Sequence, residues 1–426
     1  MSQNQIVSSY GSAGNRRRIA IVVARFPCLS ETFILNELVS LEARGHLMHV
    51  VSCAPPEMSD SSVVTGIKGA VVYGPRITVA RVLGSVAAQL IRAPVLTARL
   101  LVTLITCVPI SLRGMRQAAS CMAIACAVRR SLTGVGISHV HAHFLNRPAL
   151  VARLLAQCIG ASYSVSAHAR DVFVPDYRMR GLCAEARFVV VCSKRARAEL
   201  TARWRPISGS KPHLCYHGVD LTRLTFRGTR DRRDTGTLRV LSVCRLVPKK
   251  GIDVVLHALA ILKERGTPFT YRIAGSGSEE PTLRTLVRRL DLDEVEFLGD
   301  QATEQVHALL SWADVFVLPC RVAEDGDRDG IPNSILEAMA VGVPVVATDA
   351  GGVAEVIRHL ETGWLLPAND MRAVADALQE AATRPALVDD IVAQARREVE
   401  LRFNHAQTIE VLCALLDATR EPSCAR

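Results

Sequence analysis

The sequence predicts an α/β protein built from two doubly wound domains. At 426 residues the chain is longer than one ordinary hydrophobic core organises, so two domains are expected. Aromatic side chains are few, at 4%, whereas valine, leucine, alanine and glycine are abundant, as in parallel sheets covered by helices. Apolar, β-branched runs at 18–24 and 343–347 are typical of buried parallel strands.

The N-terminal residues 1–17 are polar and lead into a cluster of arginines. We expect a disordered tail here rather than a signal peptide, because no apolar core precedes a cleavage site. The 13 cysteines are odd in number and lack paired or metal-type spacing, which favours a reducing, cytoplasmic compartment.

Charge is distributed unevenly along the chain. Residues 1–225 hold 27 Lys and Arg against 10 Asp and Glu, and no acid occurs between Asp60 and Asp171. The segment 78–132 is apolar apart from its arginines, but its longest uncharged run, 100–112, is too short to span a bilayer. We expect basic, apolar helices that lie on an anionic membrane surface. The alternative is that these helices only cover the first sheet.

The first domain is expected over 18–226, where a strand leads to a helix with Ser30 as its N-cap. The apolar stripe of that helix is Phe33, Ile34, Leu38 and Leu41. Further on, His139, His141 and His143 alternate along a predicted strand and therefore share one face. Three imidazoles suggest zinc, but no acid or cysteine nearby in the sequence completes a ligand set, so no metal site is expected.

The second domain is expected over 238–392, after a polar linker at 227–237. Its first strand delivers Arg245 to the carboxyl end, and Lys250 follows beside a helix start. Ligands of open α/β sheets bind at that edge. Two fixed cations there suit a nucleotide diphosphate and can stabilise it as a leaving group.

Two acids flank another predicted helix start. Asp329 and Glu337 lie on either side of Asn333 and Ser334, one of which can cap the helix, and Gly342 ends it. The N–H groups of such a helix start favour an anionic or polyhydroxylated ligand. An ordinary loop–helix–strand unit is the alternative.

The spacing of these acids, followed by Ala-Met-Ala-x-Gly-x-Pro-Val-Val-Ala-Thr, resembles the signature of retaining glycosyltransferases of family 4. The resemblance is strong over 238–365 and weak over 60–135. It implies the GT-B arrangement, in which two Rossmann-like domains face each other across a cleft. It also implies transfer of a sugar from a UDP- or GDP-sugar to a hydroxyl, with retention at the anomeric carbon and no obligatory cofactor or metal.

The same resemblance assigns roles to individual residues. Arg245 and Lys250 are expected to stabilise the departing diphosphate, while His168, Asp329 and Glu337 position groups of the donor. Asp329 stands where the family usually has glutamate, so its reach is one methylene shorter. Contacts to the nucleotide sugar are expected from Gly275, Ser276, Gly277, Gly299, Gly330, Ile331, Asn333 and Ser334.

The run Ser-Glu-Thr-Phe-Ile at 30–34 resembles a subgroup associated with colanic-acid-type exopolysaccharide synthesis. In that context Glu31, Thr32 and His143 become candidates for the acceptor side. We expect the acceptor to be a lipid-linked glycan at the inner face of the cytoplasmic membrane, and no nucleic-acid partner. The tail, 393–426, is expected to be a helix that crosses back to the first domain.

Three other interpretations stay open. One is a catalytically impaired nucleotide-sugar-binding scaffold, suggested by Asp329 and by the missing glycine pair after the first strand. A second is another enzyme of the same fold, such as a nucleotide-sugar epimerase or a phosphorylase. A third takes the Asp-x-Asp spacing of Asp325, Asp327 and Asp329 as the metal site of the other large transferase fold.

Overall fold

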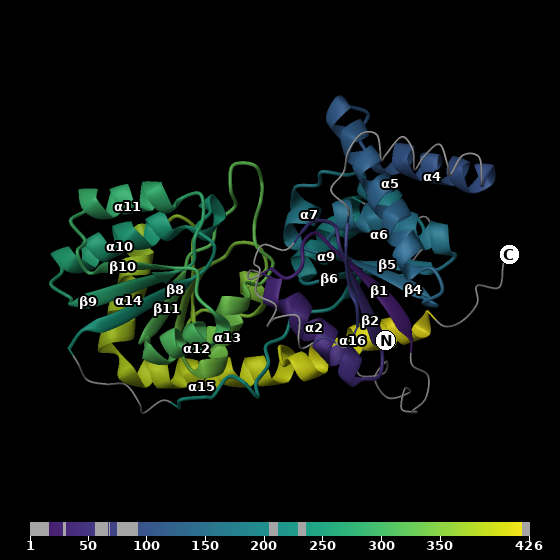
Figure 1. Cartoon of the computed structure of the whole chain (residues 1–426). Coiled ribbons are helices and arrows are strands. Elements are labelled where there is room, and N and C mark those ends of the chain that lie inside the picture. Colours follow the sequence, from purple (N-terminus) through teal and green to yellow (C-terminus); the bar gives the residue numbers. More distant parts are fainter. Residues whose placement is uncertain are drawn as a thin grey trace. The chain divides into compact units, whose positions relative to one another are not determined.

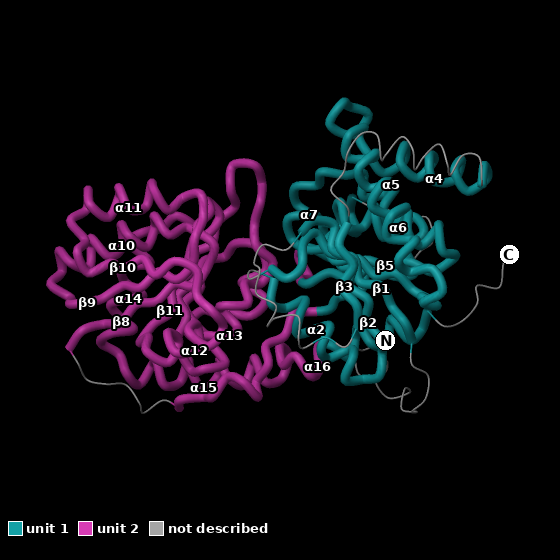
Figure 2. Tube along the Cα trace, viewed as in Figure 1, with its two compact units in different colours: residues 1–192, 196–215, 409–426 teal, residues 193–195, 216–408 magenta. Residues whose placement is uncertain are grey.

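The computed structural model describes residues 17–28, 31–55, 67, 69–74, 93–203, 212–228 and 236–419. The chain forms two compact units, each built on one parallel sheet (Figure 1). Unit 1 comprises 1–192, 196–215 and 409–426, and unit 2 comprises 193–195 and 216–408 (Figure 2). The expected N-cap Ser30, residues 1–16 of the predicted tail and the stretch 75–92 lie outside the described residues.

Unit 1 contains a seven-stranded sheet of order β3-β2-β1-β4-β5-β6-β7, in which every pairing is parallel. Its strands are β1 (Arg18–Val23), β2 (Leu47–Ser52), β3 (Val71–Tyr73), β4 (His139–His143), β5 (Ser162–Ala167), β6 (Val189–Val191) and β7 (His213–Leu214). Its helices are α2 (Thr32–Ala43), α4 (Pro94–Cys107), α5 (Leu112–Leu132), α6 (Arg147–Ile159), α7 (Ala169–Phe173), α8 (Met179–Cys183) and α9 (Lys194–Arg203), whose first two residues are grouped with unit 2.

Both faces of this sheet are covered by apolar side chains, as the period of two along a strand requires. Ala20 and Val22 of β1 point into a core shared with α4 to α9, and α5 packs beside α6 (Figure 1). Ile19 and Ile21 point to the opposite face, where they pack with α2 and with apolar residues between 409 and 416. The helix α2 begins after Glu31, which makes no side-chain cap.

Unit 2 contains a six-stranded parallel sheet of order β10-β9-β8-β11-β12-β13. Its strands are β8 (Leu238–Val243), β9 (Phe269–Ala274), β10 (Val295–Gly299), β11 (Val315–Leu318), β12 (Val345–Thr348) and β13 (Trp364–Leu366). Its helices are α10 (Ile252–Glu264), α11 (Glu280–Arg289), α12 (Thr303–Trp312), α13 (Asn333–Val341), α14 (Met371–Thr383) and α15 (Pro385–Arg402), with 3₁₀ turns η3 (Pro248–Lys250) and η4 (Val353–Glu355). The prediction of two parallel-sheet, Rossmann-like domains is confirmed.

The C-terminal segment is not the single helix expected over 393–426. It consists of the end of α15 and a second helix, α16 (His405–Ala418). The break lies at Phe403 and Asn404, where the N–H of Val219 donates to the Phe403 carbonyl at 2.9 Å. The Asn404 side chain then accepts from the Ala406 N–H at 3.1 Å and caps the new helix. From Ile409 onward the apolar face of α16 packs into unit 1.

The helix α4 has an unusual distribution of side chains. It buries Thr97 and Thr103, whereas Val95, Val102 and Ile105 are 83%, 59% and 63% exposed. The exposed apolar surface continues through the start of α5, and we call the whole set the α4–α5 apolar face: Val95, Leu101, Val102, Ile105, Ile110, Leu112 and Met115. None of the described helices combines the length and apolarity needed to cross a bilayer.

Candidate active site

The centre of the candidate site in unit 2 is an ion cluster beyond the carboxyl end of β8. The Lys250 Nζ lies 2.6 Å from Asp329 Oδ2, and the Lys249 Nζ lies 3.2 Å from Asp329 Oδ1. These side chains are at most 14% exposed. Gly251 ends the η3 turn with φ of 66° and lies so close to the Pro319 carbonyl that a Cβ would come within 2.1 Å of it. The turn therefore holds both lysines against the loop that carries Asp329.

Each charge in this cluster is maintained by its partners. Burial acts to raise the pKa of Asp329, but Lys250 and Lys249 outweigh it, so that this pKa lies well below its ordinary value. Burial likewise opposes the charge of Lys250, yet the Asp329 carboxylate raises the pKa of Lys250 above its ordinary value. Lys250 therefore stays cationic at neutral pH.

The neighbouring acids are also engaged by lysine. Asp327 lies 3.1 Å from the Lys249 Nζ, so the two acids of this Asp-x-Asp pair share Lys249. A divalent metal would have to displace two buried ammonium groups to reach these carboxylates. This pairing speaks against the Asp-x-Asp metal site.

Glu337 differs from Asp329 in its surroundings. It lies on α13, which begins at Asn333 after Pro332 as N-cap, so neither expected side-chain cap is present. Gly342 ends the helix in the left-handed region, as predicted. Burial raises the pKa of Glu337 to about 7. A carboxylate in that position gains most from a ligand that supplies hydroxyl donors.

The glycine-rich loop after β9 is fixed by its own chain. Gly275 has φ of 125°, and a Cβ there would lie 1.9 Å from the Cys244 carbonyl. Its N–H donates to the Gly299 carbonyl at 2.7 Å, and a Cβ at Gly277 would lie 2.2 Å from the Leu246 carbonyl. These contacts explain the glycines without a ligand, and they draw the loops after β8, β9 and β10 together. Ser276 donates to Asp300 at 2.8 Å.

The remaining predicted residues of unit 2 are placed around this cluster. Arg245 is exposed in the loop after β8. The Gly330 carbonyl accepts from the Gly352 N–H at 2.8 Å, which ties the Asp329 loop to the loop after β12. Ile331 is buried in the core, and Ser334 is half-buried in the first turn of α13. Sequence reasoning missed Lys249, although its position next to Lys250 was visible.

The three histidines of β4 are not equivalent. His139 and His141 bridge the serines of β5: their ring nitrogens lie 2.6 to 2.9 Å from the hydroxyls of Ser162, Ser164 and Ser166. Burial lowers the pKa of His139 to about 3 and that of His141 well below its ordinary value, so both rings are neutral. These two side chains are structural, and we call this arrangement the histidine–serine row.

His143 has a partner that the sequence did not reveal. Its Nε2 lies 3.2 Å from Oε1 of Glu37 on α2, an acid that is far from these histidines in the sequence. Glu37, His141 and His143 each offer a ligand atom within 4.8 Å of the others. Both ring nitrogens of His141 already contact serines, however, so a metal would have to break the histidine–serine row. Glu37 serves better as the group that orients His143.

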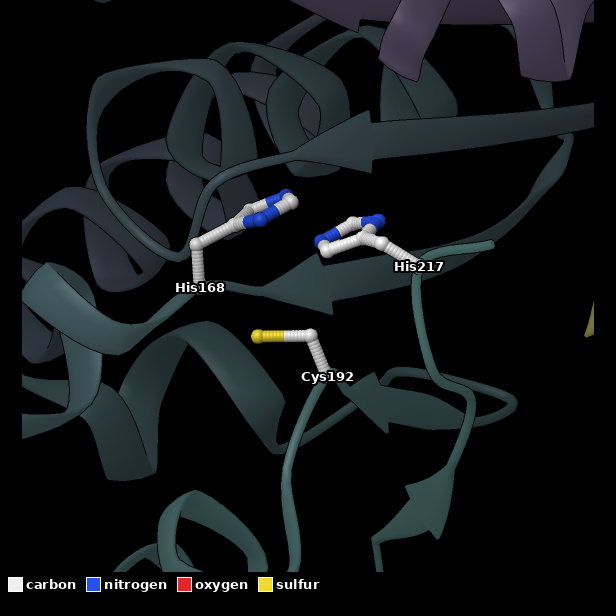
Figure 3. Close-up of side chains that lie close together, drawn as sticks. All are labelled: His168, Cys192 and His217. Atoms are coloured by element: carbon white, nitrogen blue, oxygen red, sulfur yellow. The ribbon is translucent and has the colours of Figure 1, made fainter. Parts of the chain in front are cut away.

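His168 lies at the carboxyl end of β5 and is buried. Its backbone N–H donates to Asp171 Oδ2 at 3.2 Å, and the same oxygen accepts from the backbone N–H of Leu145 at 2.8 Å. Burial raises the pKa of Asp171 to about 7 despite these donors. Figure 3 shows His168 beside Cys192, which follows β6; their ligand atoms lie within 4.8 Å. His217, also labelled there, belongs to unit 2.

The carboxylate of Glu355 accepts from the N–H groups of Lys194 and Arg195 at 2.8 and 3.0 Å. The Tyr216 hydroxyl donates to the same carboxylate at 2.8 Å. These bonds join residues 194 and 195 to Glu355 of η4 within unit 2.

A family model and a solved structure indicate the class of protein that this chain resembles. Residues 230–398 match the family model described as glycosyl transferases group 1, so this part of the chain is a glycosyltransferase group 1 domain. The fold is that of the GT-B class. HepE of Anabaena, solved in complex with UDP and glucose, is similar with a TM-score of 0.69 at 16% identity, over 95% of this chain and 100% of that chain.

Relatives by sequence narrow the resemblance to enzymes named for polysaccharide synthesis. The chain is 42% identical over 205 residues to the putative colanic acid biosynthesis glycosyltransferase WcaL of Escherichia coli, which is 47% of this chain and 50% of that protein. It is 41% identical over 181 residues to the amylovoran biosynthesis glycosyltransferase AmsK of Erwinia amylovora, 42% of this chain and 44% of that protein. The matches span about half the length of these curated relatives. The predicted resemblance to the colanic-acid-type subgroup is confirmed.

Proposed function

We propose that the protein is a glycosyltransferase of exopolysaccharide or cell-surface polysaccharide biosynthesis. It transfers a sugar from a nucleotide diphosphate sugar to a hydroxyl of a lipid-linked glycan, with retention at the anomeric carbon. The proposal rests on the glycosyltransferase group 1 domain and on the relatives named for colanic acid and amylovoran synthesis. No metal or cofactor is assigned a step.

The single observation that carries the proposal is that unit 2 holds a buried cation, Lys250, and a buried carboxylate, Glu337. Lys250 stays cationic through Asp329, which suits a group that stabilises a departing diphosphate. Glu337 is a carboxylate whose burial favours a hydroxyl-rich ligand, as the ribose of a nucleotide is. Arg245 is exposed beyond β8 and supplies a further cation for the diphosphate.

The acceptor is proposed to lie on the unit 1 side, where His143 is oriented by Glu37. The α4–α5 apolar face supports peripheral association with an anionic membrane, because it combines exposed Val102 and Ile105 with the exposed arginines Arg99 and Arg113. This surface suits the inner face of the cytoplasmic membrane, where a lipid-linked acceptor is accessible.

The test is calorimetric titration of the full chain with UDP, GDP and ADP, repeated on Glu337→Ala. Saturable binding of one nucleotide by the wild type, weakened by the substitution, is the expected result and identifies the donor class. The matched control is Glu296→Ala, an exposed acid of β10 paired with Arg272, which should leave binding unchanged. Product stereochemistry, followed by NMR once a donor is known, checks retention.

A non-catalytic scaffold is the competing function, favoured by the shorter acid at Asp329. It predicts nucleotide binding without turnover. A folded wild-type protein that binds none of the three nucleotides contradicts both the transferase and the nucleotide-sugar-binding scaffold.

A further inference from the structure

A second candidate site lies in unit 1 and shares no residue with the Lys250–Asp329 cluster of unit 2. An open pocket of about 690 Å³ lies between the start of α5 and the start of α6. Ala24, which follows β1, and Asn146, which follows β4, also line it. Loops that follow these neighbouring strands mark the edge where parallel sheets hold ligands. The volume falls within the range of about 300–1,000 Å³ that is usual for small-molecule sites.

Arginine dominates the charge of this pocket. Arg113 and Arg116 are one helical turn apart on α5, so their side chains lie on the same side of the helix. Arg147, the first residue of α6, completes a group of three guanidinium groups, against Asp176 as the one acid that lines the pocket. The Arg147 Nη2 donates to the Ser120 hydroxyl at 2.7 Å, which fixes the direction of this side chain.

The backbone adds to the positive potential of the pocket. The 13-residue helix α6 begins at Arg147 without an acid in its first turn, and its N-cap Asn146 makes no side-chain cap. The Asn146 side chain donates instead to Asp171 at 2.8 Å. The partial positive charge of this helix end is therefore not offset by its own side chains. Guanidinium groups beside a helix start are suited to phosphate oxygens.

The pocket is continuous with the α4–α5 apolar face. Leu112 lines the pocket and is 65% exposed, and its neighbour Met115 is 62% exposed. A ligand that binds with its anionic group among the arginines can therefore extend its apolar part over the α4–α5 apolar face. An amphipathic phosphate ester has this distribution of charge and apolar surface.

We propose that Arg113, Arg116 and Arg147 bind the diphosphate of a lipid-linked acceptor. The lipid chain then extends across Leu112 toward the α4–α5 apolar face. This inference rests on the proposed function, since it names the anionic part of the acceptor. A diphosphate suits the site better than a monophosphate, because three guanidinium groups offer more paired donors than one phosphate group uses.

The test uses octyl diphosphate, kept monomeric, as a soluble probe for calorimetric titration of the full chain. The wild type should bind it saturably. The double variant Arg113→Gln/Arg116→Gln should bind at least about tenfold more weakly, because each loses a charge-assisted hydrogen bond. Both positions are exposed, so the variant should fold. Arg130→Gln is the matched control on α5, about 21 Å from Arg116 along the helix axis, and should bind like the wild type.

Two parallel titrations distinguish a failure of the pocket assignment from a failure of the proposed function. UDP and GDP report on unit 2 and should bind the double variant and the wild type equally. Equal binding of octyl diphosphate by both proteins overturns the pocket and leaves the proposed function standing. A wild type that binds no nucleotide defeats the proposed function instead.

The source of the phosphate is decided by two further probes. Inorganic pyrophosphate bound as tightly as octyl diphosphate overturns the lipid-linked source, because the alkyl chain then contributes nothing. A protein that binds phosphatidylglycerol vesicles only when Arg113 and Arg116 are present, and that does not bind octyl diphosphate, overturns the proposal in favour of a membrane headgroup.

Discussion

Replacing Asp329 with asparagine removes the negative charge that two buried lysines share. Lys249 and Lys250 are 7% and 10% exposed at their side chains, so water compensates little for the loss. Breaking a buried ion pair from one side costs about 3–5 kcal/mol. We expect about 3 kcal/mol for Asp329→Asn, because the amide oxygen still accepts a hydrogen bond and Lys250 can release its proton.

The assay is differential scanning calorimetry of the full chain, with attention to the transition of unit 2. For a unit of this size, each kcal/mol shifts the Tm by about 2–4 °C, so a fall of about 6–12 °C is expected. The control is Glu296→Gln, which breaks the Arg272–Glu296 pair, 36% and 56% exposed, and should cost less than about 1 kcal/mol. A Tm of Asp329→Asn within about 2 °C of the wild type refutes the reasoning, as does an equal fall in both variants.

Three more predictions concern function. Lys250→Ala should reduce turnover more than about tenfold with a smaller effect on donor KM, measured by steady-state kinetics, because the departing diphosphate loses its cation. Nucleotide affinity should rise from pH 6 to pH 8 as Glu337, whose pKa burial raises to about 7, ionises and accepts from the ligand; Glu337→Gln should lack that part of the titration. Val102→Asp/Ile105→Asp should lose sedimentation with phosphatidylglycerol vesicles, while Arg180→Gln, an exposed change on α8, should retain it.

Local signals predicted much of unit 2. The β-branched run before Arg245, the end of α13 at Gly342 and the strand that follows it are each encoded within a few neighbouring residues. The pairing of Lys250 with Asp329 could not be predicted in this way, because the partners are 79 residues apart and meet only when the sheet has formed. The same limit hid the contact between Glu37 and His143.

The break between α15 and α16 illustrates a different limit. The buried apolar residues on the two sides of the break are Val399, Phe403, Ile409 and Leu412. The steps 399–403 and 409–412 are helical, but the step from Phe403 to Ile409 is not, so the apolar spacing is interrupted at the break. Asn404 followed three residues later by Gln407 is a capping pattern, which the prediction of one helix did not use. The buried Phe403 carbonyl accepts a hydrogen bond from the Val219 N–H at the break.

The histidine–serine row has a consequence for the direction of its protons. Ser164 has one hydroxyl hydrogen and two lone pairs and lies between a nitrogen of His139 and a nitrogen of His141, so it donates to one ring and accepts from the other, or accepts from both. Because both rings are neutral, each arrangement fixes which nitrogen of each ring carries the proton. The row from Ser162 to Ser166 therefore has three proton arrangements. One hydroxyl in β5 sets the tautomers of two histidines in β4.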